Sequence, residues 1–365
     1  MKKFLIVLTI ALLSLSFVAC SGTTQYLKLT LWRDYDYEEL TYDIVEEGVT
    51  DTGKLVMTME EIQNSTTVMI PQINNETKDI ENKEVSLERN YYYLTRTLQF
   101  PVDKANGIYD TMQNITITDA TFNPLYSFAS LTIAKEQLPY DGEGTAPDCV
   151  SYVTTTKYTY NAETSKWSAV SSCLRQTEYG KLAKEDLLFR TMEFNNLSDT
   201  TVDMNLLYYN IRFINNLTDT DDFKYQCSTP MVLESQTKGV SCTGVVEQHA
   251  VDSRVPYVYN AYKNAFGESF GGFSLDLMKV TIFPSGQAVT GSGITVYYSR
   301  QPILASEELV GLQASQLQEA TTNKGSHRVP VIIEENTRPN STTQLYPDSR
   351  GTITYRLVGL TNVKH

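Results

Sequence analysis

Positive charge is scarce in this sequence, and the few basic residues do not form a patch. Thirty lysines and arginines stand against 43 aspartates and glutamates, which gives a formal net charge of −13 at pH 7. A protein that binds nucleic acid needs clustered lysine and arginine side chains to displace the counterions of the phosphate backbone. The composition therefore argues against a nucleic-acid partner, and it predicts repulsion from anionic lipid head groups.

Histidine and paired cysteine motifs are also scarce. The three histidines, His249, His327 and His365, are widely separated along the chain. No Cys-x-x-Cys pair accompanies them, as the common zinc sites would require. We therefore expect neither a bound metal nor a cofactor.

Long apolar runs are absent after residue 20, where no segment reaches the ~20 apolar residues of a membrane-spanning helix. The first twenty residues differ. Lys2 and Lys3 precede an apolar run that leads into Phe17-Val18-Ala19-Cys20. This pattern is typical of a bacterial lipoprotein signal peptide, which is cut before the cysteine that then carries lipid. An ordinary secretory signal with an incidental cysteine is the alternative.

The signal predicts a protein anchored to the cell membrane through lipid on Cys20, on the extracytoplasmic face. Loss of Lys2 and Lys3 makes the mature chain more acidic still, at −15, so the lipid has to hold it at the membrane. We expect a signal peptide over 1–20, a tether and first strand over 21–34, and a single β domain over 35–365 with a polar insertion at 306–326.

Four further cysteines suggest disulfides in such a compartment. Cys149 and Cys173 lie on either side of a polar turn at 161–163, so a hairpin would place them opposite each other. Cys227 and Cys242 similarly flank residues 234–239. We predict pairing in sequence order, and four reduced thiols are the alternative.

Apolar and polar residues alternate with a period of two along much of the chain, which predicts half-buried strands. Tyr, Thr, Val and Ile are enriched there, as a pleated surface favours. The predicted strands cover residues 27–31, 40–45, 55–59, 91–99, 115–121, 152–160, 278–283, 294–298, 329–333 and 353–357.

One segment, 202–214, has a helical period instead. Thr200 or Thr201 could cap it, and Asp203 falls in its first turn. Its apolar stripe consists of Val202, Leu206, Leu207, Ile211 and Ile214. Residues 307–320 are a weaker candidate for a second helix, because Gly311 interrupts a thin apolar stripe.

Together these elements predict a mainly β fold, a large curved antiparallel sheet that forms a half-barrel or open barrel. An antiparallel sheet buries at least one face, so it has to curl, form a sandwich or cover its concave side with the helix near 202–214. No period of 20–50 residues repeats, which argues against a solenoid or a propeller.

One motif resembles a catalytic site. Gly267-Glu268-Ser269-Phe270-Gly271 fits the nucleophile elbow of serine hydrolases, and Asp276 and His327 follow in the order of a triad. An elbow needs a buried strand before the serine and a helix after it. Residues 260–266 make a poor strand and 273–283 alternate like one, so we prefer a glycine-rich loop and expect no enzyme.

Several short phrases resemble an exported bacterial family known as a domain of unknown function, numbered three-one-zero-eight. They are Leu40-Thr41-Tyr42-Asp43, Gly53-Lys54-Leu55, the segment Leu206–Arg212, Phe283-Pro284-Ser285-Gly286, the segment Ile294–Tyr298 and the segment Arg328–Ile333. The resemblance spans most of 35–360 and implies a curved antiparallel sheet with one helix packed near it. It brings no catalytic residues, and the insertion at 306–326 and the four cysteines depart from it.

The leading functional hypothesis is a membrane-anchored, non-enzymatic envelope protein that binds a lipid, another small hydrophobic ligand or an envelope polymer. A structural or protein-binding surface lipoprotein is the alternative, and a serine hydrolase using Ser269 is a remote one. We expect the ligand to contact Tyr42, Met57, Met59, Tyr298 and Tyr355. A register shift of one residue would turn all five outward.

Overall fold

The computed structural model describes fourteen stretches of the chain. They are residues 36–45, 53–103, 108–134, 149–177, 188–198, 201–212, 222–232, 235–267, 274–285, 294–300, 303–313, 315–316, 328–336 and 352–363. The predicted signal peptide with Cys20, the tether at 21–34, Ser269, His327 and His365 lie outside these residues.

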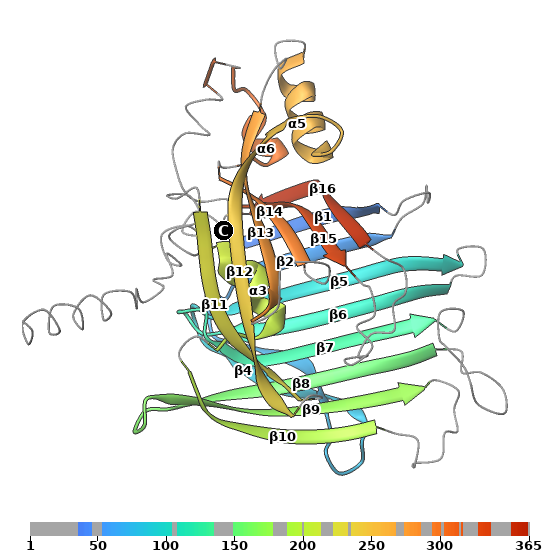
Figure 1. The fold of residues 1–365 in the computed structure, drawn as a ribbon, viewed down its shortest axis with the longest axis vertical. Helices are drawn as coiled ribbons and strands as arrows, with labels where there is room; N and C mark the ends of the chain where they lie inside the picture. The colour runs from blue at the N-terminus through green and yellow to red at the C-terminus, as the bar shows by residue number, and fades with distance from the viewer. Residues whose placement is uncertain are drawn as a thin grey trace, which may run out of the picture.

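A single antiparallel sheet of fourteen strands dominates the molecule (Figure 1). The sheet curls until it is nearly closed as a barrel, with one gap. This confirms the predicted large curved antiparallel sheet. In spatial order its strands are β10 (Leu188–Leu197), β9 (Lys166–Thr177), β8 (Cys149–Asn161), β7 (Pro124–Ala134), β6 (Ile108–Thr118), β5 (Tyr92–Asp103), β2 (Lys54–Glu61), β1 (Tyr37–Val45), β16 (Thr352–Val363), β15 (Pro330–Asn336), β14 (Ile294–Ser299), β13 (Ser274–Pro284), β12 (Gln236–Ala250) and β11 (Asp222–Met231).

The predicted strands within the described residues all appear, with shifted ends. The one predicted at 115–121 stops at Thr118 because Asp119 starts a turn. The Asp119 carboxylate accepts hydrogen bonds from the backbone N–H groups of Thr121 and Asn123 at 2.7 and 2.9 Å. Such side-chain bonds compete with a strand ladder and end it.

Strands β10 and β11 are the two edges of the sheet, and the segment that leaves β10 bridges them. Thr201 forms a parallel bridge with Ser228 of β11, and the Val202 N–H donates to the Ser228 carbonyl at 2.8 Å. Arg190 of β10 also donates to the Ser235 hydroxyl at 3.1 Å. The gap is therefore spanned by the strand-to-helix connection.

The predicted helix is present but shorter than expected. It is a 3₁₀ turn, η3 (Met204–Leu206), that continues as α3 (Leu207–Arg212), and Asp203 caps it in place of a threonine. Figure 1 shows α3 inside the curl of the sheet. All six α3 residues are buried, so the helix fills the space that the sheet encloses.

Two further helices lie together beyond one end of the strands (Figure 1). The sequence analysis missed α5 (Pro256–Phe266), which packs on β16 through a buried stripe that includes Val258 and Tyr262. Of the weak candidate at 307–320, the described residues include α6 (Ser306–Leu309), whose Leu309 is buried. The start of the predicted polar insertion is thus anchored to the core.

The sheet changes its apolar face along its width. Around β1, β2 and β12–β16 the concave side is apolar and packs on α3. Across β6–β9 most buried apolar side chains lie on the convex side instead, including Ile115, Phe128, Val153 and Leu174, whereas Tyr158 and Ala169 are buried on the concave side. A separate hairpin, β3 (Thr66–Ile73) with β4 (Ile80–Leu87), contacts β7, β8 and β9 there and buries them.

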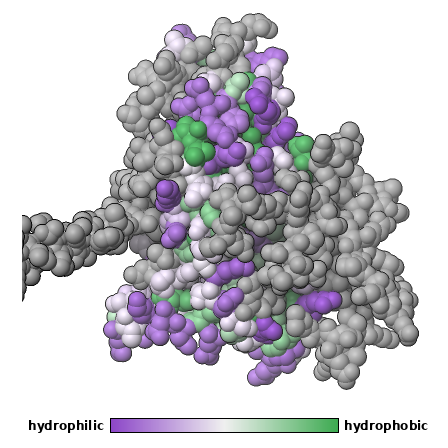
Figure 2. All heavy atoms as spheres, viewed as in Figure 1, coloured by the Kyte–Doolittle hydropathy of each residue, from purple (hydrophilic) through white to green (hydrophobic). Residues whose placement is uncertain are grey.

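Hydrophilic side chains cover much of the described surface on one side of the molecule, and hydrophobic ones form small separate patches (Figure 2). Below them, a continuous core joins the central strands to α3, α5 and α6.

Candidate functional site

The five residues predicted to contact a ligand all point into the core. The exposed fraction of Tyr42, Met57, Met59, Tyr298 and Tyr355 is 0–1%. All five therefore lie on the inward face of the sheet, as the alternation predicted. A side chain without accessible surface also has no water-sized space beside it, so these five are packed against protein and do not line a cavity. In this respect the predicted site is wrong.

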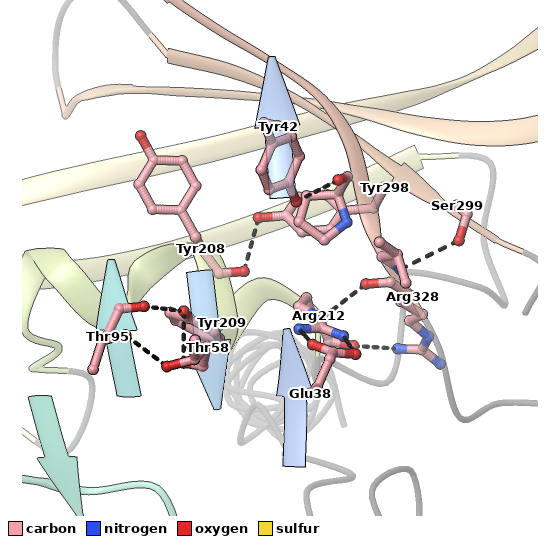
Figure 3. Close-up of polar contacts among 12 residues, drawn as sticks. Glu38, Tyr42, Thr58, Thr95, Tyr208, Tyr209, Arg212, Tyr298, Ser299 and Arg328 are labelled. Carbon is pink, nitrogen blue, oxygen red and sulfur yellow. Dashed lines mark hydrogen bonds and ion pairs between the residues drawn. The ribbon is translucent and has the colours of Figure 1, made fainter. Parts of the chain in front are cut away.

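The tyrosine hydroxyls in this group are bound to the protein itself. Tyr42 donates to the Pro330 carbonyl at 2.7 Å, and Tyr298 donates to the Tyr208 carbonyl of α3 at 2.9 Å (Figure 3). Tyr209 of α3 lies within 3.1 Å of the carbonyls of Thr58 and Thr95. A buried tyrosine usually finds such a partner. These bonds fix α3 to strands on both sides of it.

A buried ion pair holds the end of α3. Arg212 donates two hydrogen bonds to the Glu38 carboxylate, at 2.6 and 2.9 Å, and both side chains are 1% exposed. Arg212 also donates from Nε to the Arg328 carbonyl at 2.9 Å (Figure 3). Burial alone would lower the pKa of Arg212, but Glu38 raises it above its usual value. The pair thus stays ionised.

A second ion pair crosses the interior between β5 and β15. Arg96 and Glu335 are 2.5 Å apart, and Tyr208 and Tyr355 donate to the same carboxylate at 2.7 and 2.9 Å. Burial would raise the pKa of Glu335, but Arg96 and the two tyrosine hydrogen bonds hold it below its usual value. The guanidinium also lies over the Tyr208 ring, 4.6 Å from its centre. These contacts form a buried polar network with a structural role.

A third polar contact fixes η3 to the sheet. The Asp203 carboxylate accepts from the Tyr158 hydroxyl at 2.7 Å and from the Asn205 N–H at 2.9 Å. The Asn205 amide then donates to the Ser127 hydroxyl of β7. Burial raises the pKa of Asp203, and the hydrogen bonds offset this only in part.

Asp203→Asn is expected to change how stability depends on pH. Because the native pKa is raised, this group's contribution is fully present below the unfolded value near 3.8 and is lost as pH rises through the native pKa. The asparagine does not titrate. From pH 3.5 to pH 7, the free energy of unfolding of the wild type should therefore fall relative to that of the variant. Urea unfolding of both proteins at both pH values measures this. If the difference between the two free energies is the same at pH 3.5 and pH 7, the pKa of Asp203 is not raised.

The concave face of β6–β10 differs from the packed half of the interior. Its hydroxyl row, Thr116, Ser127, Thr156 and Ser171, is buried near η3. Four residues further along each strand, on the same face, lies another row of side chains, most of which are half-buried and apolar. Register places it across five neighbouring strands in the order Leu98, Met112, Leu131, Tyr152 and Arg175. We call its four half-buried members, Leu98, Met112, Leu131 and Tyr152, the apolar strip; solvent reaches part of each of these side chains.

Two arginines stand at the end of the apolar strip. Arg175 of β9 is exposed and lies directly opposite Tyr152, and Arg190 of β10 is half-buried and lies opposite Cys173. The two arginines are diagonal neighbours on one face, a relation that brings Cα atoms to roughly 7–8 Å. Sequence reasoning missed them, although the period of two places them on one face.

The predicted disulfides are not formed. Cys173, Cys227 and Cys242 are free, buried thiols, and burial raises the pKa of Cys227 to about 12. Cys173 pairs in register with Thr154, five positions along β8 from Cys149, which is about 17 Å. The hairpin was predicted correctly, but its turn lies further along, which separates the two cysteines. Cys227 and Cys242 are diagonal, opposite Val240 and Tyr225.

The other sequence motifs do not assemble a catalytic centre from described residues. Helix α5 ends before Ser269 and β13 begins after it, which is the reverse of the order that a nucleophile elbow requires. Asp276 accepts a hydrogen bond from Gln248. His249 is half-buried and lies 3.3 Å from Glu247.

No group of three or more metal-binding side chains occurs within the described stretches. No helix in that part of the chain is long and apolar enough to cross a membrane. Searches against protein-family models, curated proteins and solved structures returned no match for this chain.

Proposed function

We propose that this chain is a lipid-anchored, non-enzymatic envelope protein that binds a hydrophobic or amphipathic ligand on the concave face of β5–β10. The observation that carries the proposal is the half-buried apolar strip, Leu98, Met112, Leu131 and Tyr152, on the inside of the curl. Ligand sites are concave and mostly apolar, with a few placed polar groups. The strip and its two arginines have this composition.

The packed half of the interior supports the same assignment by its rigidity. Helix α3 fills it, and two buried ion pairs and several tyrosine hydrogen bonds fix the curvature of the sheet. The concave face opposite is thereby held in one shape before a ligand arrives. Such preorganisation lowers the cost of binding.

Binding of a neutral apolar fluorophore, N-phenylnaphthylamine, tests the site on the soluble form that begins at Ser21. We expect saturable binding near one probe per chain, weakened by about tenfold or more in Leu131→Asp. Thr111→Asp is the matched control, because Thr111 is exposed on the opposite face of the neighbouring strand β6. It should bind like wild type. Absent or non-saturable binding, or equal loss in both variants, would refute the site.

A structural or protein-binding role is the second candidate, and one feature favours it. Tyr160 and Trp167 pack together near the turn of the β8–β9 hairpin, with ring centres 5.2 Å apart, and Tyr160 is 49% exposed. Exposed aromatic pairs are common in protein interfaces. Without probe binding, this pair becomes the surface to mutate in pull-down experiments from envelope extracts.

A further inference from the structure

The turn between β8 and β9 carries an aromatic pair at one end of the sheet. Tyr160 lies directly opposite Trp167, with ring centres 5.2 Å apart. Tyr160 is 49% exposed and Trp167 is half-buried. In Figure 1 this turn projects beyond the neighbouring strands. We call residues 160–167 the hairpin tip.

A small buried cluster supports the aromatic pair. Tyr158, on the same face, packs with Phe194 and Leu197 of β10, and Trp167 packs against this cluster. The Tyr158 hydroxyl donates to the Asp203 carboxylate at 2.7 Å. The hairpin tip is therefore held in place before it meets a partner, which lowers the cost of binding.

The hairpin tip lies at the end of the sheet where β1 begins. Register partners lead from Tyr37 through one residue of each intervening strand to Lys157 of β8. Five strand spacings separate these two residues, about 24 Å along the sheet. Tyr160 is three positions further towards the turn, so the tip stands about 10 Å beyond this row.

A lipid on Cys20 would bring this same end of the sheet to the membrane. Fifteen residues separate Cys20 from Asp36, where β1 is about to start. Fully extended, that length of chain spans at most about 55 Å. This exceeds the separation of Tyr37 from the hairpin tip, so the anchor leaves enough chain for the tip to touch the membrane.

The composition of the hairpin tip suits a membrane surface. Tryptophan and tyrosine favour the membrane–water interface, because the ring is buried while its polar atom stays hydrated. Residues 157–168 contain two lysines and one glutamate, a local net charge of +1 in a chain of −13. Anionic head groups, which repel the acidic chain as a whole, therefore do not repel this segment.

We propose that the hairpin tip docks on the membrane to which the chain is anchored, with Tyr160 and Trp167 at the level of the lipid head groups. This inference rests on the lipid anchor of the proposed function. The lipid supplies most of the affinity, and the aromatic pair sets the orientation. Tyr152 of the apolar strip is eight positions from Tyr160 along β8, about 26 Å. Docking thus directs the strip away from the membrane.

Trp167 reports on its own depth. The chain has two tryptophans, so Trp32→Phe leaves Trp167 alone. The form that begins at Ser21 is tethered by an N-terminal hexahistidine tag to phosphatidylcholine vesicles that contain a nickel-chelating lipid. We expect vesicles of phosphatidylcholine brominated near the head group to reduce Trp167 fluorescence about twofold or more relative to plain vesicles. Equal fluorescence in the two kinds of vesicle would overturn the proposal.

Val245→Trp, in a chain whose own tryptophans are replaced by phenylalanine, is the matched control. Val245 is 49% exposed, like Tyr160. Its register row includes Asp43, six positions along β1 from Tyr37, or about 20 Å. Its fluorescence should be the same in brominated and plain vesicles. Equal quenching at Val245→Trp and Trp167 would show that the tethered chain has no preferred orientation, contrary to the proposal.

A second pair of variants assigns the docking to the aromatic pair. On the same tethered vesicles, Tyr160→Ser should reduce the quenching of Trp167 about twofold or more. Val170→Ser should leave it unchanged, because Val170 is a 44% exposed side chain of the same hairpin that points to the opposite face. Unchanged quenching in Tyr160→Ser, or equal loss in both variants, would refute the assignment.

The anchor and the docking surface can fail separately. Metabolic labelling with palmitate, compared between wild type and Cys20→Ala, tests the lipid on Cys20. If Cys20 carries no label, the anchor of the proposed function fails, whatever the tethered chain does. If Cys20 is labelled but tethered Trp167 is not quenched, the anchor stands and membrane docking is excluded. The aromatic pair then belongs to the protein-binding role.

Discussion

Arg212→Met is expected to lower the free energy of unfolding by about 3–5 kcal/mol. The substitution removes the cation but leaves the Glu38 carboxylate buried, at 1% exposure, without its two charged hydrogen bonds. Breaking a buried ion pair in this way costs much more than the pair itself contributes. Chemical denaturation followed by tyrosine and tryptophan fluorescence measures the change.

The double variant Glu38→Leu with Arg212→Met separates the cost of an unpaired charge from the loss of contacts. Apolar residues of similar volume often replace a buried pair without loss of stability. We therefore expect the double variant to recover most of the stability lost in Arg212→Met. If the free energy of unfolding of Arg212→Met alone lies within about 1 kcal/mol of the wild-type value, water reaches Glu38.

Phe128→Ala is expected to cost about 3–5 kcal/mol, although Phe128 lies on the convex side of the sheet. The side chain is 3% exposed because the β3–β4 hairpin covers it. The same denaturation measurement applies.

Ala129→Ser is the control for this experiment, since Ala129 is the next residue and points to the concave face. A substitution at a half-exposed position of this kind should change the free energy of unfolding by no more than about 0.5 kcal/mol. A small effect at Phe128 together with a large one at Ala129 would mean that the two faces are reversed.

Periodicity predicted correctly which side chains point inward from a strand, but it did not predict what those side chains contact. Tyr42, Met57 and Tyr355 were placed on the correct face, because alternation depends on the chain locally. Whether that face is packed or open depends on α3, whose contacts come from residues far away in the sequence. Arg212 and Glu38 are 174 positions apart, and neither the alternation around Glu38 nor the helical period around Arg212 indicates a partner, so their pairing had no local signal.

Helix α5 was missed although signals were present. Pro256 stands at its first turn, and Val258 and Tyr262 are spaced by four, as a buried helical stripe requires. Residues 260–266 were judged a poor strand, and a helix was not considered there. Strands β3 and β4 were missed for a different reason. Strand β4 is largely exposed and polar, so its sequence shows neither a buried face nor that β3 and β4 form a separate hairpin outside the main sheet.

The pairing of β1 with β16 has a consequence for how the molecule forms. Tyr37 lies beside Val363 in the middle of the sheet, so the seam between the first and last of the described strands closes only after residues 352–363 have been made. Contacts of such sequence separation slow folding. During synthesis, the edge of β1 that pairs with β16 stays unpaired until β16 has been made. A protein of this topology therefore suits folding after its synthesis is complete, with its unfinished edges kept apart from other chains in the meantime.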